Sequence, residues 1–73
     1  MDVKINGIYR HFKGNTYQVV LICKDCDTLE DLVIYKDLNS DKIWARKKDE
    51  FLSKVDTNKY PDVKQIYRFE LIK

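Results

Sequence analysis

The chain has 73 residues, of which 14 are Lys or Arg and 12 are Asp or Glu, so its net charge is +2. This length holds one small domain and excludes large cofactor folds such as a dinucleotide-binding sheet or a (β/α) barrel. Apolar residues make up 44% of the chain, too many for a disordered protein and enough for one small core. Val and Ile together occur 13 times and Ala once, which favours β-sheet over a helical bundle.

The first predicted elements form a hairpin. Residues 8–13 and 16–23 both have strand character, and Gly14-Asn15 between them suits a two-residue turn. Residues 16–23 are β-branched and almost continuously apolar, so we predict a central strand that is buried on both faces over part of its length.

The remaining elements follow with short connections. Residues 24–28 form a polar loop, residues 30–35 a strand, residues 39–41 a turn and residues 42–46 a fourth strand. Phe51 and Val55 then stand four residues apart, which predicts one or two helical turns over residues 49–55. A polar loop over residues 56–65 leads to a closing strand over residues 66–72.

Together these elements predict a mainly β fold over a single domain, residues 1–73. Curling the sheet on itself buries one face and protects the edges of so short a chain. We therefore expect a small SH3-like barrel of about five strands with one short helical turn. An oligonucleotide-binding-type barrel is the less favoured alternative, because it usually needs longer strands and loops.

The compartment and cofactor content follow from what the chain lacks. It has neither the apolar run of about 7–15 residues of a signal peptide nor the roughly 20 of a membrane span, so we expect a cytoplasmic protein. Cys23 and Cys26 supply only two of the four ligands of a structural zinc site. They also lie between two predicted strands rather than at a helix start, where a redox pair is found. We predict no metal and no cofactor.

One basic segment stands out from the otherwise interleaved charges. Residues 42–48 place four cations around the only Trp, and strand alternation puts Lys42, Trp44 and Arg46 on one side. This arrangement suits stacking of a base beside phosphate contacts, so single-stranded nucleic-acid binding through Lys42, Trp44, Arg46, Lys47 and Lys48 is one hypothesis. The alternative is that Trp44 fills the barrel and the charged stems cover its edge.

The five tyrosines support a different hypothesis. Aromatic rings with a polar tip suit concave surfaces that recognise peptides, and they equally suit half-buried strand positions. A protein or peptide interaction module is our first functional hypothesis, and it predicts tyrosines clustered in a groove away from the strongest positive charge. The tyrosines are Tyr9, Tyr17, Tyr35, Tyr60 and Tyr67.

Catalysis has the least support. His11 is the only histidine and could act as a general base, but no nucleophile or acid partner can be identified by spacing. We place His11 on the outer face of its strand beside Tyr9 and Lys13, and we predict that the protein is not an enzyme. An enzyme would require His11 within hydrogen-bond reach of a carboxylate.

Several segments resemble a short bacterial family, domain of unknown function 1653. Residues 7–19, Gly-Ile-Tyr-Arg-His-Phe-Lys-Gly-Asn-Thr-Tyr-Gln-Val, look like its opening signature. Later matches are similar to its Glu-Thr-x-Glu, Val-Val-Tyr, Trp-Val-Arg, Met-Phe and Arg-Phe steps. In this chain those matches are Asp27-Thr28-Leu29-Glu30, Val33-Ile34-Tyr35, Trp44-Ala45-Arg46, Phe51 and Arg68-Phe69.

The resemblance implies an SH3-type barrel and no established activity. The family tends to have His-Ser where this chain has Asp25-Cys26, so the cysteine pair is peculiar to this chain. Arg10 stands in an otherwise apolar set, and we expect it to pair with Glu30 across the sheet. The signature positions also include Thr28. Those that we take as candidate binding residues are Tyr9, His11, Lys13, Glu30, Tyr35, Trp44 and Arg46.

Overall fold

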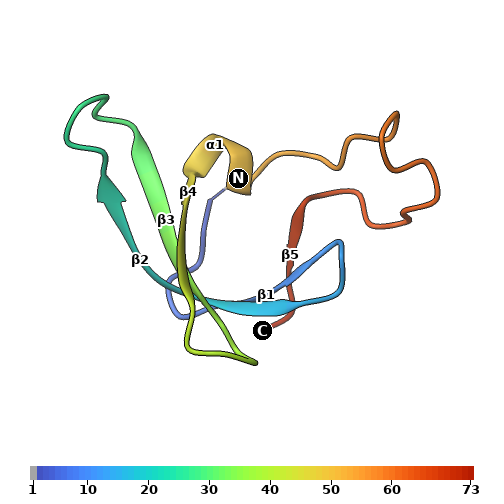
Figure 1. The fold of residues 1–73 in the computed structure, drawn as a ribbon, viewed down its shortest axis with the longest axis horizontal. Helices are drawn as coiled ribbons and strands as arrows, with labels where there is room; N and C mark the ends of the chain where they lie inside the picture. Colours follow the sequence, from blue (N-terminus) through green and yellow to red (C-terminus); the bar gives the residue numbers. More distant parts are fainter. Residues whose placement is uncertain (1) are drawn as a thin grey trace.

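A computed structural model describes residues 2–73 and contains five strands and one short helix (Figure 1). Every strand pairs antiparallel with its neighbours, and the order across the sheet is β4-β3-β2-β1-β5. The mainly β fold with five strands and one helical turn is therefore confirmed, in a small barrel-like form. The elements are β1 (Ile8–His11), β2 (Thr16–Lys24), β3 (Asp31–Asp37), β4 (Ile43–Lys47), α1 (Lys48–Phe51) and β5 (Phe69–Leu71).

The chain after α1 links the two ends of the sheet. The Val55 amide donates to the Ile66 carbonyl at 2.9 Å, and the Arg68 amide donates to the Ser53 carbonyl at 2.8 Å. Lys54 and Tyr67 form an antiparallel bridge between these two bonds. The predicted closing strand, residues 66–72, thus pairs with β1 from β5 onward, and its first residues pair instead with the segment that follows α1.

The core lies on the inner face of the bent sheet, under α1. The Phe51 ring stacks on Phe69 with a centroid distance of 4.1 Å and an interplanar angle of 8°. Tyr9 and Tyr35 pack edge-on against Phe51 at 5.2 and 5.6 Å. Four of the seven residues in this buried cluster are therefore aromatic. The seven are Val3, Tyr9, Val19, Val33, Tyr35, Phe51 and Phe69.

Strand β2 is buried on one face only, which corrects the prediction of burial on both faces. Val19 is fully buried, whereas Val20 and Leu21 are 38% and 45% exposed. The register of β2 against β3 shifts between Val19 and Leu21, as at a β-bulge. Within residues 2–73 the single short helix packs on the inner side, so no second layer covers the outer face of β2.

The first hairpin lies where it was predicted but has a longer turn. The His11 carbonyl accepts from the Gly14 amide at 2.8 Å, and the His11 amide donates to the Asn15 carbonyl at 2.8 Å. The loop therefore comprises residues 12–14, a three-residue connection rather than the expected two-residue turn. Gly14 has φ +108°, a conformation that residues with a Cβ rarely adopt.

Candidate functional site

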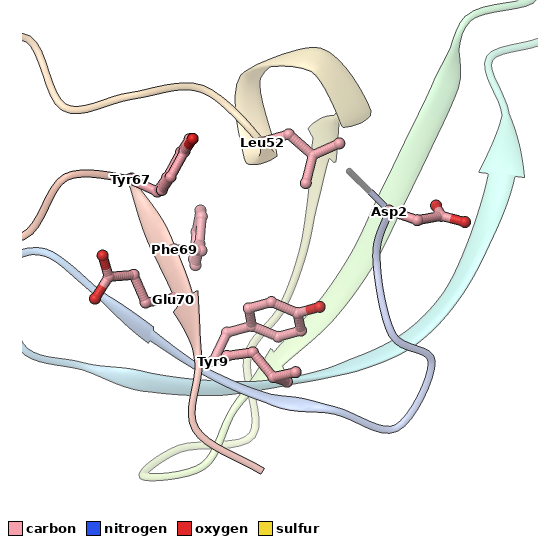
Figure 2. Close-up of a pocket in the computed structure, with 7 residues that line it drawn as sticks. Asp2, Tyr9, Leu52, Tyr67, Phe69 and Glu70 are labelled. Atoms are coloured by element: carbon pink, nitrogen blue, oxygen red, sulfur yellow. The ribbon is translucent and has the colours of Figure 1, made fainter.

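A cavity of about 300 Å³ lies beside β5, and its lining is mainly apolar and aromatic. Figure 2 shows Leu52 and Tyr67 on one side of the space and Tyr9 across from them. The lining residues come from the N-terminal segment, β1, the residue after α1, the bridge residue before β5, and β5 itself. They are Asp2, Tyr9, Leu52, Tyr67, Phe69, Glu70 and Leu71.

The floor of this cavity is part of the core, and its rim is accessible. Tyr9 is buried, and its hydroxyl accepts a hydrogen bond of 2.8 Å from the Lys4 amide. Leu71 lies opposite Tyr9 in the β1–β5 register and is about half exposed. Tyr67 is half-buried at the end of the bridge to Lys54. The cavity therefore combines a fixed floor with aromatic and aliphatic side chains that a ligand can reach.

The charged groups that line this cavity are carboxylates. Asp2 and Glu70 are its charged residues, with their carboxylates turned outward from the hollow in Figure 2, and among residues 2–73 no Lys or Arg belongs to the lining. The Val3 amide donates to the Asp2 carboxylate at 2.8 Å, and Lys48 Nζ lies 3.1 Å from the same oxygen. These two groups lower the pKa of Asp2 below its ordinary value, so its side chain stays ionised at neutral pH. An apolar hollow with acidic neighbours complements an apolar side chain that stands next to a cation.

A second candidate surface lies on the inner face toward Trp44. In the sheet register Tyr35 lies opposite both Val19 and Trp44, and Tyr17 lies opposite Tyr9. Directly opposed residues share a face of the sheet, and so do residues two apart on one strand. Half-buried or exposed side chains of three strands and one loop therefore approach one another here. We name this the aromatic–basic surface, and it comprises His11, Tyr17, Trp44, Arg46 and Arg68.

Rings and hydrogen bonds connect three members of the aromatic–basic surface, His11, Tyr17 and Arg46, through the core residues Tyr35 and Phe69. The His11 ring lies 4.9 Å from Phe69, and the Arg46 guanidinium carbon lies 5.8 Å from the same ring centroid. Arg46 Nε donates to the Tyr35 hydroxyl at 3.2 Å, and the Tyr17 and Tyr35 rings are 5.2 Å apart. Of the candidates chosen from sequence, His11, Tyr35 and Arg46 are thus brought together, and Trp44 lies opposite Tyr35 in the sheet register.

His11 lies on the inner face, so the prediction of an outer position is wrong. It is half-buried between Phe12 and Phe69, and its Nδ1 accepts from the Lys13 amide at 3.1 Å. That bond leaves the proton of the neutral imidazole on Nε2. Burial, followed by the charges of Arg46, Arg68 and Lys13, lowers the pKa of His11 to about 4. Among residues 2–73 no carboxylate is hydrogen-bonded to it.

The other sequence candidates lie apart from these two groups. Glu30 Oε2 is 3.4 Å from Lys47 Nζ, and Arg10 lies opposite Glu70, so the expected Arg10–Glu30 pair is wrong. The reason is topological, because β2 and β5 flank β1 and separate it from the loop that carries Glu30. Lys13 is exposed in the hairpin turn, with its Nζ 5.6 Å from the Tyr60 ring.

The side chains of the basic segment, residues 42–48, fall into two groups with different surroundings. Trp44 is 47% exposed, so it does not fill the barrel, and Lys42 Nζ lies 6.0 Å from its ring. Arg46 faces the core side opposite Val33, with its Nη1 3.8 Å from Glu50. The lysines at positions 47 and 48 instead form ion pairs with Glu30 and Asp2. Three of the five residues proposed for nucleic-acid contact therefore share a side.

The cysteine loop brings three side chains of metal-ligand type, two carboxylates and one thiol, close together. Side-chain ligand atoms of Asp25, Cys26 and Asp27 lie within 4.8 Å of one another. The Asp25 carboxylate accepts from the Asp27 and Thr28 amides at 2.8 and 3.2 Å, bonds that close the turn and lower the pKa of Asp25. Cys23 and Cys26 are both free thiols. The hydrogen bonds of the loop account for this cluster.

The sequence matches the family described as Protein of unknown function (DUF1653) over residues 7–71. The chain belongs to this family. The DUF1653 match runs from the residue before β1 to the end of β5, so it covers the whole sheet and the aromatic–basic surface. Searches of the curated proteins and of the solved structures gave no match. No helix within residues 2–73 is long and apolar enough to cross a membrane.

Some of the residues in these two surfaces were not among the candidate binding residues selected from the sequence. Tyr67, Phe69 and Leu71 alternate in the predicted closing strand, and that alternation is the signal that they share a face. Leu52 and Asp2 carried no comparable signal, because only the tertiary fold brings them to β5. Arg68 joins the aromatic–basic surface for the same reason.

Proposed function

We propose that this chain, folded as an SH3-like barrel, is a small cytoplasmic binding module that recognises a peptide segment. The segment would carry an apolar side chain next to Lys or Arg, and it would dock at the cavity beside β5. The observation that carries this proposal is the cavity itself, about 300 Å³ in volume, with an aromatic and aliphatic lining and two carboxylates. The free thiols of Cys23 and Cys26 support the cytoplasmic location.

The apolar lining supports the affinity of such a complex. Tyr67 and Leu71 at the rim and Phe69 at the floor offer ring and methyl surface to one inserted side chain. Full burial of a Leu-sized side chain is worth about 1.5–3 kcal/mol. Aromatic anchors near the centre of an interface usually contribute most of the binding energy. Tyr67 is the residue that we expect to matter most.

The carboxylates support the charge preference. Asp2 and Glu70 belong to different elements around the cavity. Lys48 already pairs with Asp2 at 3.1 Å, whereas Glu70 is in none of the ion pairs among residues 2–73 and supplies the uncompensated negative charge. A basic residue beside the inserted side chain would meet this negative charge, whereas an acidic one would be repelled. Because both carboxylates face solvent, their effect should appear as selectivity between peptides and as salt dependence more than as affinity.

The test is a binding measurement with defined peptides. The probes are an array of synthetic peptides, about ten residues long, with Leu, Phe or Ala at the centre and Lys, Ser or Glu beside it. We expect binding of the Leu and Phe peptides flanked by Lys, and chemical-shift changes at the amides of Leu52, Tyr67 and Leu71 when the best peptide is titrated. Changes confined to other strands would contradict the proposal.

A pair of tyrosine variants gives the matched control. Tyr67→Ala should weaken peptide binding at least about tenfold, because it removes the rim of the cavity. Tyr60→Ala removes a ring of the same size and similar exposure that packs on Phe12 instead, and it should leave the affinity unchanged. Glu70→Gln should reduce the preference for Lys over Glu. Equal effects of the two tyrosine substitutions would overturn the proposal.

A further inference from the structure

We infer that the aromatic–basic surface is a separate site for single-stranded nucleic acid. None of its five residues lines the cavity beside β5, so this inference goes beyond the proposed peptide site. It rests on three features: an exposed aromatic ring, guanidinium groups anchored in place, and a local excess of positive charge that carboxylates do not balance.

One exposed aromatic ring offers a stacking position. The Trp44 indole is 47% exposed on the edge strand β4, and Lys42 Nζ lies 6.0 Å from its ring. Tyr17 on β2 is half-buried, with its ring 5.2 Å from that of Tyr35. Bases of any sequence stack on such rings, since every base has a π face. Trp44 therefore provides the exposed stacking surface, whereas Tyr17 packs against the core beside Tyr35.

The guanidinium groups are positioned by the protein and retain donors for a ligand. Arg46 Nε is held by the Tyr35 hydroxyl at 3.2 Å, and Arg68 Nε is held by the Ser53 hydroxyl at 3.1 Å. Arg carries five N–H donors, so each bond through Nε fixes the plane of the group and leaves terminal nitrogens available. Such a planar fork matches the oxygens of a phosphate.

The charge around His11 points to an anion. The positive charges of Arg46, Arg68 and Lys13 all lower the pKa of the imidazole. Among residues 2–73, neither Arg68 nor Lys13 forms an ion pair with a carboxylate. Arg46 has one distant partner, Glu50, at 3.8 Å. His11 is neutral at pH 7 and presents Nε2–H as a further donor. Phosphodiesters would balance this charge, and the exposed indole favours nucleic acid over an acidic peptide.

Fluorescence of Trp44, the only Trp of the chain, reports nucleic-acid binding directly. Titration of the full chain with an oligothymidylate of about ten nucleotides should quench Trp44 fluorescence at low salt, because a base stacks on the indole. If Arg46, Arg68 and Lys42 each neutralise a phosphate, the logarithmic salt slope is about −2, so raising salt about tenfold weakens binding about 100-fold. Absence of quenching and of any change in oligonucleotide anisotropy at low salt would overturn the inference.

Matched charge variants locate the site. Arg46→Gln and Arg68→Gln should each weaken binding about fivefold to tenfold and make the salt slope shallower by about 0.7. Lys47→Gln and Lys48→Gln remove the same charge from lysines paired elsewhere and should change affinity less than about twofold. Circular dichroism melting of each variant confirms that it is folded. Equal weakening by all four substitutions would indicate diffuse attraction and overturn the site.

Two further experiments distinguish base stacking from charge attraction, and this nucleic-acid site from the peptide site. With a fluorescent oligonucleotide, Trp44→Ala should weaken binding about tenfold, whereas Trp44→Phe should retain most of it. A poly-Glu peptide that binds as tightly as the oligonucleotide, or inorganic phosphate that displaces it at similar concentration, would overturn base recognition. Tyr67→Ala should leave oligonucleotide binding unchanged, so this inference and the peptide proposal can fail independently.

Discussion

His11 illustrates how neighbours, rather than sequence position, decide the state of a single residue. Lys13 is near it in sequence, whereas Arg46 and Arg68 reach it from β4 and from the residue before β5. All three are cations, and the imidazole is also half-buried against Phe69. The charged form of the ring is therefore disfavoured in the folded protein, and the ring acts as a neutral donor at physiological pH.

We predict that the single histidine resonance of the folded protein titrates with a pKa near 4, measured by NMR. The ordinary pKa of about 6.5 applies to the unfolded chain, so the unfolded state binds the proton more tightly. This contribution to stability is complete above about pH 6.5 and is lost as the pH falls through 4. Because His11 is half-exposed, solvent screening reduces the loss to about 1–2 kcal/mol.

The control for this titration is His11→Gln, which removes the imidazole and leaves the carboxylates that titrate in the same range. The difference in urea-unfolding free energy between pH 7 and pH 4 should be smaller in the variant by the amount given above. An NMR pKa near 6.5 would show that the ring is neither buried against Phe69 nor close to the charges of Arg46 and Arg68. Equal pH dependence of the two proteins would lead to the same conclusion.

At the level of elements, the sequence located the strands well and their burial poorly. Gly14-Asn15 predicted the first hairpin, because both residues tolerate the positive φ angles of a two-residue turn, although the actual loop has three residues. The apolar run in β2 predicted burial on both faces, yet Val20 and Leu21 are exposed. Burial of the second face requires a covering layer, and whether a layer exists depends on the whole chain rather than on the run itself.

The hairpin gives a prediction at the same scale. Gly14 has φ +108°, and a Cβ placed there would meet no atom within 4 Å, so only backbone strain opposes a side chain. Gly14→Ala should lower the free energy of unfolding by about 1 kcal/mol, measured in urea. Gly14→Asn should cost less, because Asn tolerates positive φ better than Ala. If Ala and Asn were both as stable as Gly, the turn would have a different conformation in solution.

At the scale of the whole molecule, both candidate surfaces form because the two ends of the sheet come together. Alternation along residues 42–46 did predict that Trp44 and Arg46 share a side, since that relation is local. The cavity was not predicted, because Asp2, Leu52 and β5 come together only after α1 folds over the sheet and residues 53–55 pair with 66–68. The Phe69 ring lies between the two surfaces, lining the cavity and contacting His11.

The stability of this arrangement depends on one aromatic stack. Phe51 is almost fully buried on α1, stacks on Phe69 at 4.1 Å and also contacts Tyr9 and Tyr35. A single core in a domain of this size supplies about 3–5 kcal/mol of stability. Removal of a buried Phe side chain costs about 3–5 kcal/mol. The loss from one substitution is therefore comparable to the whole stability of the domain.

We predict that Phe51→Ala is largely unfolded at 25 °C, as judged by loss of amide chemical-shift dispersion, whereas Phe51→Leu still unfolds cooperatively in urea at a lower midpoint. Trp44→Ala is the control, because it deletes a larger side chain that is 47% exposed and should cost less than about 1 kcal/mol. Burial rather than size then decides the effect, since the exposed indole leaves no cavity when it is removed. A Phe51→Ala protein with the wild-type unfolding midpoint would mean that the stack of Phe51 on Phe69 is not what holds α1 against the sheet.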